Sequence, residues 1–289
     1  MNQTINKYSK QIIIVNSIFI LFWLTISIFP FIWTLWGSFK VKADFFSRAD
    51  WTYALNGFNT LIETGATTTI KAYLESWTEG EFGRATMNTM IVTVSVVSIS
   101  LFLGTLGAYA LSRPTFKYTF YILIIALIFR AMPHITLVSG YLFPFFQLNI
   151  WGILPTTIIV LVAINQPFTL WLLYSFFKTV PKELDESALI DGCSYFQAFR
   201  YIIMPVMWPG VVTAGLFSMM LAYNDFTVTA LLLNQHNYTM VPKINAYLGT
   251  VEYGGNYMWA VSSVVSATAP LFMIIWFFQR QLILSLIHI

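Results

Sequence analysis

Acidic residues are concentrated in one short segment of an otherwise apolar chain. The chain has 289 residues, of which 57% are hydrophobic and only 9% are charged, yet four of its twelve acids lie between Glu183 and Asp191. Gly192 follows this cluster, and an apolar segment leads from there to Pro205. Clustered carboxylates can serve catalysis or form a polar contact surface, and the rest of the sequence decides between these two uses.

The motifs that would supply catalysis do not occur in the sequence. No glycine is followed by lysine, which excludes the phosphate-binding loop GxxxxGK[ST] of nucleotide hydrolases. The metalloprotease pattern HExxH and the nucleophile pattern GxSxG are also missing. A single cysteine, Cys193, excludes an internal disulfide and a multi-cysteine metal site. We therefore expect no catalysis, no metal and no cofactor bound by this chain, and interpret the acidic segment as a surface element.

Two further ionisable residues, Arg130 and Asp225, lie inside strongly apolar segments. Charges at mid-bilayer are costly and usually face a cavity or a partner. Asn224 and Asp225 either line a translocation pathway or anchor one helix to another by hydrogen bonds, and the second reading is favoured. Arg130 would pair with Asp225 or with an acid on another subunit. His134 is interpreted as a packed or interfacial histidine.

The elements that position these residues are predicted to be transmembrane helices. Soluble domains carry roughly 25% charged residues, so this chain has too few to cover a water-facing surface. About twenty consecutive apolar residues span a bilayer core. Six segments meet this length, at approximately 12–36, 86–111, 119–144, 152–176, 207–233 and 258–279.

The first apolar run superficially resembles a signal peptide, but it is too long for one and has no small-residue cleavage site. We therefore expect a retained first helix. Polar loops are predicted at 37–85 and 234–257. Lysine and arginine residues favour an orientation with the N-terminus inside, which assigns 181–205 to the cytoplasm.

One predicted helix carries small residues at a spacing of four, Gly104 with Ala108 and Gly107 with Leu111. Small residues at this spacing let two helix backbones approach closely in lipid. They could equally be incidental residues on a lipid-facing surface, so both interpretations remain open.

The acidic segment is predicted to form two short helices joined by a glycine turn. Pro181 can open a helix whose first-turn acids lie near the positive end of the helix dipole. Gly192 suits the helix stop, and Ser194 with Gln197 forms a capping-box pattern for the second helix. The first helix has an apolar stripe made of Leu184, Ala188 and Leu189.

The order of residues in this segment resembles the EAA loop of bacterial ABC importer permeases. That family pattern is Glu-Ala-Ala, three residues, Gly, nine residues, Ile-x-Leu-Pro, and its spacing agrees throughout. Ser187 and Met204 are the two mild departures. The match extends over about 82–281 to the carbohydrate permeases similar to the maltose-transporter G subunit. It includes 82-FGRATMNTMIV-92, 223-YNDFTVTALLL-233 and 258-MWAVSSVVSATAPLFMIIWFFQRQ-281.

The resemblance implies an all-α membrane protein with six transmembrane helices, cytoplasmic termini and a cytoplasmic EAA coupling loop. In this family the loop docks in a groove of a separate ATPase dimer, which binds ATP and Mg²⁺. A paralogous second permease and an extracytoplasmic solute-binding protein complete the importer in the bacterial inner membrane. The apolar stripe would fill the groove. The positions carried over to coupling are Glu186, Ser187, Ala188, Asp191, Gly192, Ile202 and Pro205.

The expected organisation is an N-terminal part with the first helix (1–36), an extracytoplasmic loop (37–85), the permease core (86–281) and a tail (282–289) that departs from the family pattern. The expected substrate is a disaccharide or oligosaccharide. The alternatives are a polyol or glycerol derivative, an ATP-independent secondary transporter and an intramembrane enzyme. Expected partners are the other subunits and membrane lipid, without nucleic acid.

Overall fold

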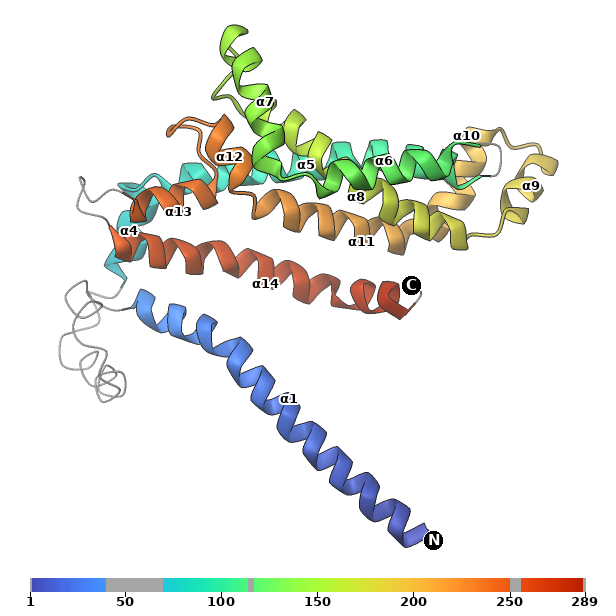
Figure 1. Ribbon diagram of the computed structural model, residues 1–289, viewed down its shortest axis with the longest axis horizontal. Coiled ribbons are helices and arrows are strands. Elements are labelled where there is room, and N and C mark those ends of the chain that lie inside the picture. Colours follow the sequence, from blue (N-terminus) through green and yellow to red (C-terminus); the bar gives the residue numbers. More distant parts are fainter. Residues whose placement is uncertain (1, 40–69, 114–116, 250–255, 288–289) are drawn as a thin grey trace. The chain divides into compact units, whose positions relative to one another are not determined.

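The computed structural model describes residues 2–39, 70–113, 117–249 and 256–287, with the side chains of 2–11 and 280–287 left out. This described part is helical, apart from loops and one isolated bridge between Gly152 and Leu233 (Figure 1). The chain forms two compact units. One comprises residues 1–80 and 247–268, and the other comprises 81–246 and 269–289.

Five helices in the described part are long and apolar enough to cross a membrane, and a bent pair of helices could supply a sixth span. The prediction of a multi-pass helical protein is therefore confirmed. The five spans are Ile12–Ser38 of α1 (Asn2–Ser38), all of α5 (Phe82–Ser112), all of α8 (Leu154–Thr179), Tyr195–Tyr223 ending in α11 (Met204–Tyr223), and Tyr257–Gln279 of α14 (Tyr257–Ile287).

The third predicted span, 119–144, is wrong as a continuous helix. The chain forms α6 (Thr119–Ala131) and α7 (His134–Gln147), whose axes differ by 87°. Pro133 explains the break, because it has no backbone N–H to continue α6 and it disfavours a helical conformation at the preceding residue. Met132 is indeed extended, with φ −69° and ψ 140°.

The fifth predicted span, 207–233, is also placed wrongly at both ends. The helical path starts earlier, at α10 (Tyr195–Ala198), and continues through a π-helical turn, η2 (Phe199–Ile203), into α11. Helix α11 ends at Tyr223, and a separate short helix, α12 (Thr227–Leu232), follows. The break at 224–226 arises because the Asp225 carboxylate engages the first free amides of α12, as described below.

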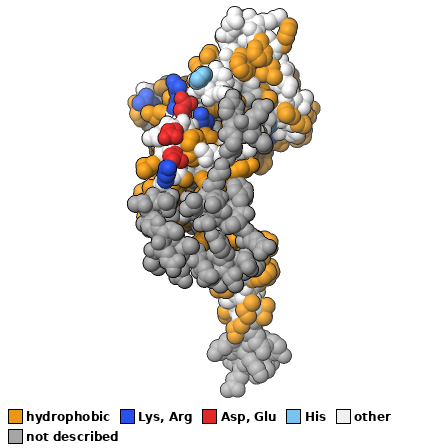
Figure 2. All heavy atoms as spheres, turned by 90° about the vertical axis from the view of Figure 1, so that its left-hand side faces the viewer, with side chains coloured by type: hydrophobic (Ala, Val, Ile, Leu, Met, Phe, Trp, Pro, Cys, Tyr) orange, Lys and Arg blue, Asp and Glu red, His pale blue; other side chains and the backbone are white. Residues whose placement is uncertain are grey.

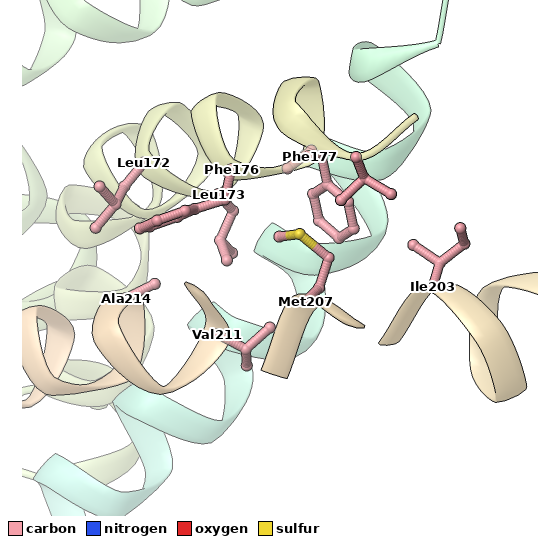
Figure 3. Close-up of a cluster of buried hydrophobic side chains, with 10 residues drawn as sticks. Leu172, Leu173, Phe176, Phe177, Ile203, Met207, Val211 and Ala214 are labelled. Carbon is pink, nitrogen blue, oxygen red and sulfur yellow. The ribbon is translucent and has the colours of Figure 1, made fainter. Parts of the chain in front are cut away.

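Three long helices of the larger unit, α5, α8 and α11, pack around a common apolar core. Figure 3 shows Leu172, Phe176 and Phe177 of α8 on one side of this core and Met207 and Val211 of α11 on the other. One polar contact joins the same two helices, between the hydroxyls of Thr169 and Ser218 at 2.9 Å. Close packing with a few buried hydrogen bonds is what holds helices together in lipid.

The small residues of α5 lie at this helix contact. A Cβ added to Gly104 would lie 2.9 Å from Thr169 Cγ2 and 3.2 Å from Leu173 Cδ1, both on α8. Ala108 is fully buried in the same core. For these two residues the helix-contact interpretation is therefore confirmed over the lipid-facing one.

A second apolar cluster holds α7 and α12 against the long helices. It contains Val92 and Val96 of α5, Val138 of α7, Val160 of α8 and Val228 of α12, all buried. The loop before α13 (Met240–Leu248) is tied to α5 by polar contacts, including Met240 N–H donating to Thr89 Oγ1 at 2.8 Å. These contacts hold α7 and α12 against the long helices and the start of α13 against α5.

The smaller unit contains α1, α4 (Lys71–Thr78) and the first part of α14. Two side chains of α4 join it to the helices on either side. Tyr73 donates its hydroxyl to Ser38 Oγ of α1 at 2.7 Å, and Glu75 accepts from Trp259 Nε1 of α14 at 3.1 Å. The large apolar side chains of α1 are mostly exposed, as expected of a helix that faces lipid.

The face in Figure 2 carries one small group of acidic and basic side chains, while much of the rest that is coloured by type is hydrophobic. Most of the predicted loop 37–85, residues 40–69, lies outside the described residues.

Candidate functional site

The acidic segment folds as the local signals predict, into a helix, a glycine turn and a second helix. Helix α9 (Glu183–Ile190) has three acids in its first turn. Gly192 has φ +87°, a conformation that glycine adopts without strain, and a Cβ there would meet nothing within 4 Å. The capping box is formed, with Ser194 Oγ accepting from Gln197 N–H at 3.3 Å and Gln197 Oε1 accepting from Ser194 N–H at 2.8 Å.

The apolar stripe of α9 faces this chain's own core. Ala188 is 1% exposed, and Leu184 packs against the cluster formed by α5, α8 and α11. The sequence interpretation, in which the stripe fills a groove on a partner, therefore does not hold for Ala188, whereas Leu184 is half-buried and its part in a contact stays a prediction. The physical reason is that the adjoining ends of the long helices already supply an apolar surface that the short helix covers.

Asp185 ties α9 to the end of α5. Its Oδ2 lies 2.6 Å from Arg113 Nη2, and the two side chains are 12% and 14% exposed. Tyr109 donates its hydroxyl to Asp185 Oδ1 at 2.5 Å, and the Arg113 guanidinium lies 5.1 Å from the centre of the Tyr109 ring. The Tyr109 ring also packs against Phe177 and Phe199, with centroids 5.7 and 4.9 Å apart. We call Tyr109, Arg113 and Asp185 the anchor cluster, because they join α9 to α5 while their neighbours belong to α8 and η2.

The opposite face of the segment is exposed and mixes aromatic with polar side chains. Ile190 is 86% exposed, Tyr195 72%, Phe196 63% and Tyr201 66%. A group of large apolar side chains with such high exposed fractions is typical of a surface that a partner covers. Of the seven predicted coupling positions, Ala188 is buried and Ile202 is half-buried in η2, and the exposed ones are Glu186, Ser187, Asp191, Gly192 and Pro205.

A second candidate region is a cavity of about 320 Å³ among α6, α7, α8 and the 224–226 break, which we call cavity A. It brings together all three residues that the sequence assigned to a pathway. Its polar lining consists of Arg130, His134, Asn165, Asn224, Asp225 and Thr227.

Asp225 lines cavity A and caps the start of α12. Its Oδ1 accepts from the backbone N–H groups of Val228 and Thr229, both at 3.0 Å, and its carbonyl oxygen accepts from Thr229 Oγ1 at 2.7 Å. A carboxylate that satisfies the free amides of a helix start stabilises that start. These bonds reach only three and four residues along the chain, so they cap α12 and do not join it to another helix. The predicted anchor between helices stays a prediction, and the lining of cavity A keeps a pathway contact open.

Arg130 contacts His134 instead of a carboxylate. Arg130 Nη1 lies 2.9 Å from His134 Nε2. Because a guanidinium can only donate, Nε2 must accept, so the imidazole is neutral with its proton on Nδ1. Of the two pairings considered for Arg130, the ion pair with Asp225 is not formed in the described part of the chain, although both residues line the same cavity. The pairing with an acid on another subunit stays a prediction.

Sequence reasoning missed the anchor cluster and Asn165. Tyr109 and Asp185 are 76 residues apart, and no local pattern connects them. Asn165 lies in an apolar run of α8, where an amide is unusual, and this was a signal that the sequence offered.

The sequence comparisons with known proteins all match membrane components of transport systems. The family described as binding-protein-dependent transport system inner membrane component matches residues 9–286. The diacetylchitobiose uptake system permease protein NgcG of Streptomyces coelicolor is 28% identical over 275 residues, covering 91% of this chain and 83% of that protein. The trehalose/maltose transport system permease protein MalG of Thermococcus litoralis is 31% identical over 266 residues, covering 90% of both.

The fold is also similar to a solved structure. The crystal structure of a bacterial ABC transporter involved in the import of the acidic polysaccharide alginate has a chain that superposes with a TM-score of 0.73. The match covers 92% of this chain and 95% of that one, at 18% identity. The chain thus has the fold of that transporter chain.

Proposed function

Because the chain belongs to the binding-protein-dependent transport system inner membrane component family, we propose that it is a permease subunit of an ABC importer for a carbohydrate. The family membership carries this proposal. Two relatives with high coverage are named as permeases for diacetylchitobiose and for trehalose/maltose, which supports a sugar substrate. The chain has no phosphate-binding loop of its own, so the ATP and Mg²⁺ would be bound by a separate ATPase.

The docking surface for that ATPase is the exposed face of the segment 181–205. Ile190, Tyr195 and Phe196 would enter a groove in the manner of an amphipathic helix, and aromatic side chains commonly dominate the energy of such contacts. Glu186 and Asp191 would contribute polar contacts at the rim. Gly192 would set the angle between α9 and α10 and so the shape of the surface.

The segment must lie in the cytoplasm for this docking to occur. An N-terminus on the inside assigns most basic residues near the membrane to the cytoplasmic side, which supports this orientation and cytoplasmic termini. These residues are Lys7, Lys10, Arg113, Lys117, Lys178, Lys182, Arg200 and Arg280.

Movement of the ATPase would reach the membrane through the anchor cluster. A push on α9 is passed to α5 by the Asp185 carboxylate, which both Arg113 and Tyr109 hold. Helices α5, α8 and α11 share one core, so they would respond together and alternately open cavity A to each side. A second permease subunit would form the other half of the pore, and a solute-binding protein would deliver the sugar from outside.

The coupling role is tested with Glu186→Ala and Gly192→Val in the complete importer. Both variants should reach the membrane in normal amounts, because Glu186 and Gly192 are both exposed and lie outside the core. Sugar-stimulated ATP hydrolysis should fall about tenfold, which corresponds to a loss of about 1.4 kcal/mol of docking energy. Glu79→Ala removes an equally exposed acid from α4–α5 and serves as the control. Normal stimulated hydrolysis in both variants would contradict the coupling role.

A further inference from the structure

Helix α4 of the smaller unit has three different sectors around its axis. The sector that contacts α1 and α14 includes Ser76, which is fully buried. A second sector is apolar and exposed, and its members Ile70, Leu74 and Trp77 have exposed fractions of 56%, 64% and 45%. Residues spaced by four and three lie on one side of a helix, so these three form a continuous surface, which we call the α4 stripe. The third sector is polar and consists of Lys71, Glu75, Thr78 and Glu79.

Helix α4 is bound where two membrane spans end. Tyr73 donates to Ser38, the last residue of the α1 span. Ser262 of α14 donates to the carbonyl oxygen of Ala72 at 3.2 Å. Ser262 comes five residues after Tyr257, where the α14 span begins, which is about 7.5 Å along a helix axis. Because α4 contacts the end of one span and the start of the other, both ends lie at one membrane face and α4 lies there with them.

The α4 stripe lies at the depth of the lipids. Trp77 Nε1 donates to Ser266 Oγ at 3.4 Å. Ser266 comes nine residues after Tyr257, or about 13.5 Å along the helix axis from the start of the α14 span. Amphipathic helices that lie in a membrane interface insert their apolar face about 5–10 Å into the boundary between headgroups and acyl chains. Tryptophan is also enriched at this boundary. The depth of Trp77 therefore fits a helix that lies in the interface.

The α4 stripe adjoins the exposed apolar surface of α1. Phe39, which directly follows α1, packs against Tyr73 with ring centroids 5.8 Å apart. Ile32 and Leu35, in the last two turns of α1, are 60% and 46% exposed. A water-soluble partner would approach from the water side, where α4 presents its polar sector. Lipid is therefore the occupant that the depth and the chemistry of the stripe favour.

We propose that α4 is an interfacial helix whose stripe of Ile70, Leu74 and Trp77 inserts among the phospholipids of the leaflet at which α1 ends. The polar sector then faces water, and the buried sector keeps the end of α1 joined to the start of α14. Lipid thereby holds these two spans at a fixed depth in the bilayer. The inference goes beyond the proposed function, because it depends on the membrane spans and not on the cargo or the ATPase.

The test replaces Leu74 by the photo-crosslinking residue p-benzoylphenylalanine in the complete importer. The complex is reconstituted in vesicles of phosphatidylethanolamine and phosphatidylglycerol and illuminated. Mass spectrometry of the peptide that contains α4 then separates phospholipid adducts from cross-links to protein. The matched control carries the same residue in place of Glu79, which is exposed on the polar sector of the same helix. A lipid reference carries it in place of Phe22, which is 59% exposed in the middle of the α1 span.

Position 74 should give at least about fivefold more phospholipid adduct than position 79, because only the apolar face of an interfacial helix enters the lipid. All three complexes should melt like the wild type, since each replaced side chain is exposed. Equal phospholipid adducts at positions 74 and 79, or none at position 74 when position 22 gives them, would overturn the proposal. A cross-link to the solute-binding protein or to the second permease as the main product at position 74 would also overturn it and would assign the stripe to that protein.

Discussion

Replacing Asp185 by leucine should free the acidic segment from α5 without unfolding the core. The Arg113 guanidinium would lose the carboxylate oxygen at 2.6 Å and the Tyr109 hydroxyl would lose its acceptor. Removing one partner of a buried ion pair costs about 3–5 kcal/mol. We take the lower end, about 3 kcal/mol, because more than a tenth of each side chain remains exposed. That energy corresponds to a roughly 150-fold change in the equilibrium for local opening.

Hydrogen exchange in the purified importer measures this opening directly. Backbone amides of α9 should exchange roughly 150-fold faster in Asp185→Leu, while those of α8 keep the wild-type rate. The double variant Arg113→Met, Asp185→Leu replaces both charges by apolar side chains of similar size, so α9 should return to within about tenfold of wild type. Sugar-stimulated ATP hydrolysis should be lower than in the wild type in both the single and the double variant. Wild-type exchange in the single variant, or equal exchange in the single and the double, would refute the anchoring role.

Two smaller perturbations test other parts of the fold. Asp225→Asn keeps an acceptor for the α12 amides and should assemble normally, whereas Asp225→Ala should cost about 1 kcal/mol and lower the melting temperature of the complex. Equal melting of the two would argue against the capping of α12 by this carboxylate. Gly104→Ala should cost about 1–3 kcal/mol, because its new methyl group would lie 2.9 Å from Thr169. The matched Gly140→Ala, whose Cβ meets nothing within 4 Å in α7, should be neutral or stabilising by up to about 1 kcal/mol, and a similar loss in both would contradict the close-contact explanation.

The local structure of the acidic segment could be predicted because its signals are local. A glycine that takes φ +87° and a Ser-x-x-Gln capping box act over a few residues, and both formed as expected. The direction in which α9 faces could not be predicted. Leu184 and Ala188 look like a docking stripe until the surface beneath them is known, and an inward-facing Asp185 is understandable only once Arg113 has been brought to it.

The membrane helices show the same limit at a larger scale. Hydropathy alone counts apolar residues, and the run 119–144 is apolar enough to count as one span even with Arg130 in it. Hydropathy does not record that Pro133 ends a helix, so it predicts one span where α6 and α7 form a bent pair. The end of α11 was missed for a similar reason. The 224–226 break depends on two hydrogen bonds to the Asp225 carboxylate, and hydropathy does not record hydrogen bonds.

The arrangement around α9 also predicts that residue spacing should matter more than residue identity in this segment. Successive side chains on a helix point about 100° apart, so Asp185 can face inward while Glu186, its neighbour, faces outward. Inserting or deleting a single residue in α9 would turn its outward side chains toward the core formed by α5, α8 and α11. The same change would bring the Asp185 carboxylate into water. Length changes in this short stretch should therefore be far more damaging than exchanges such as alanine for serine at position 187.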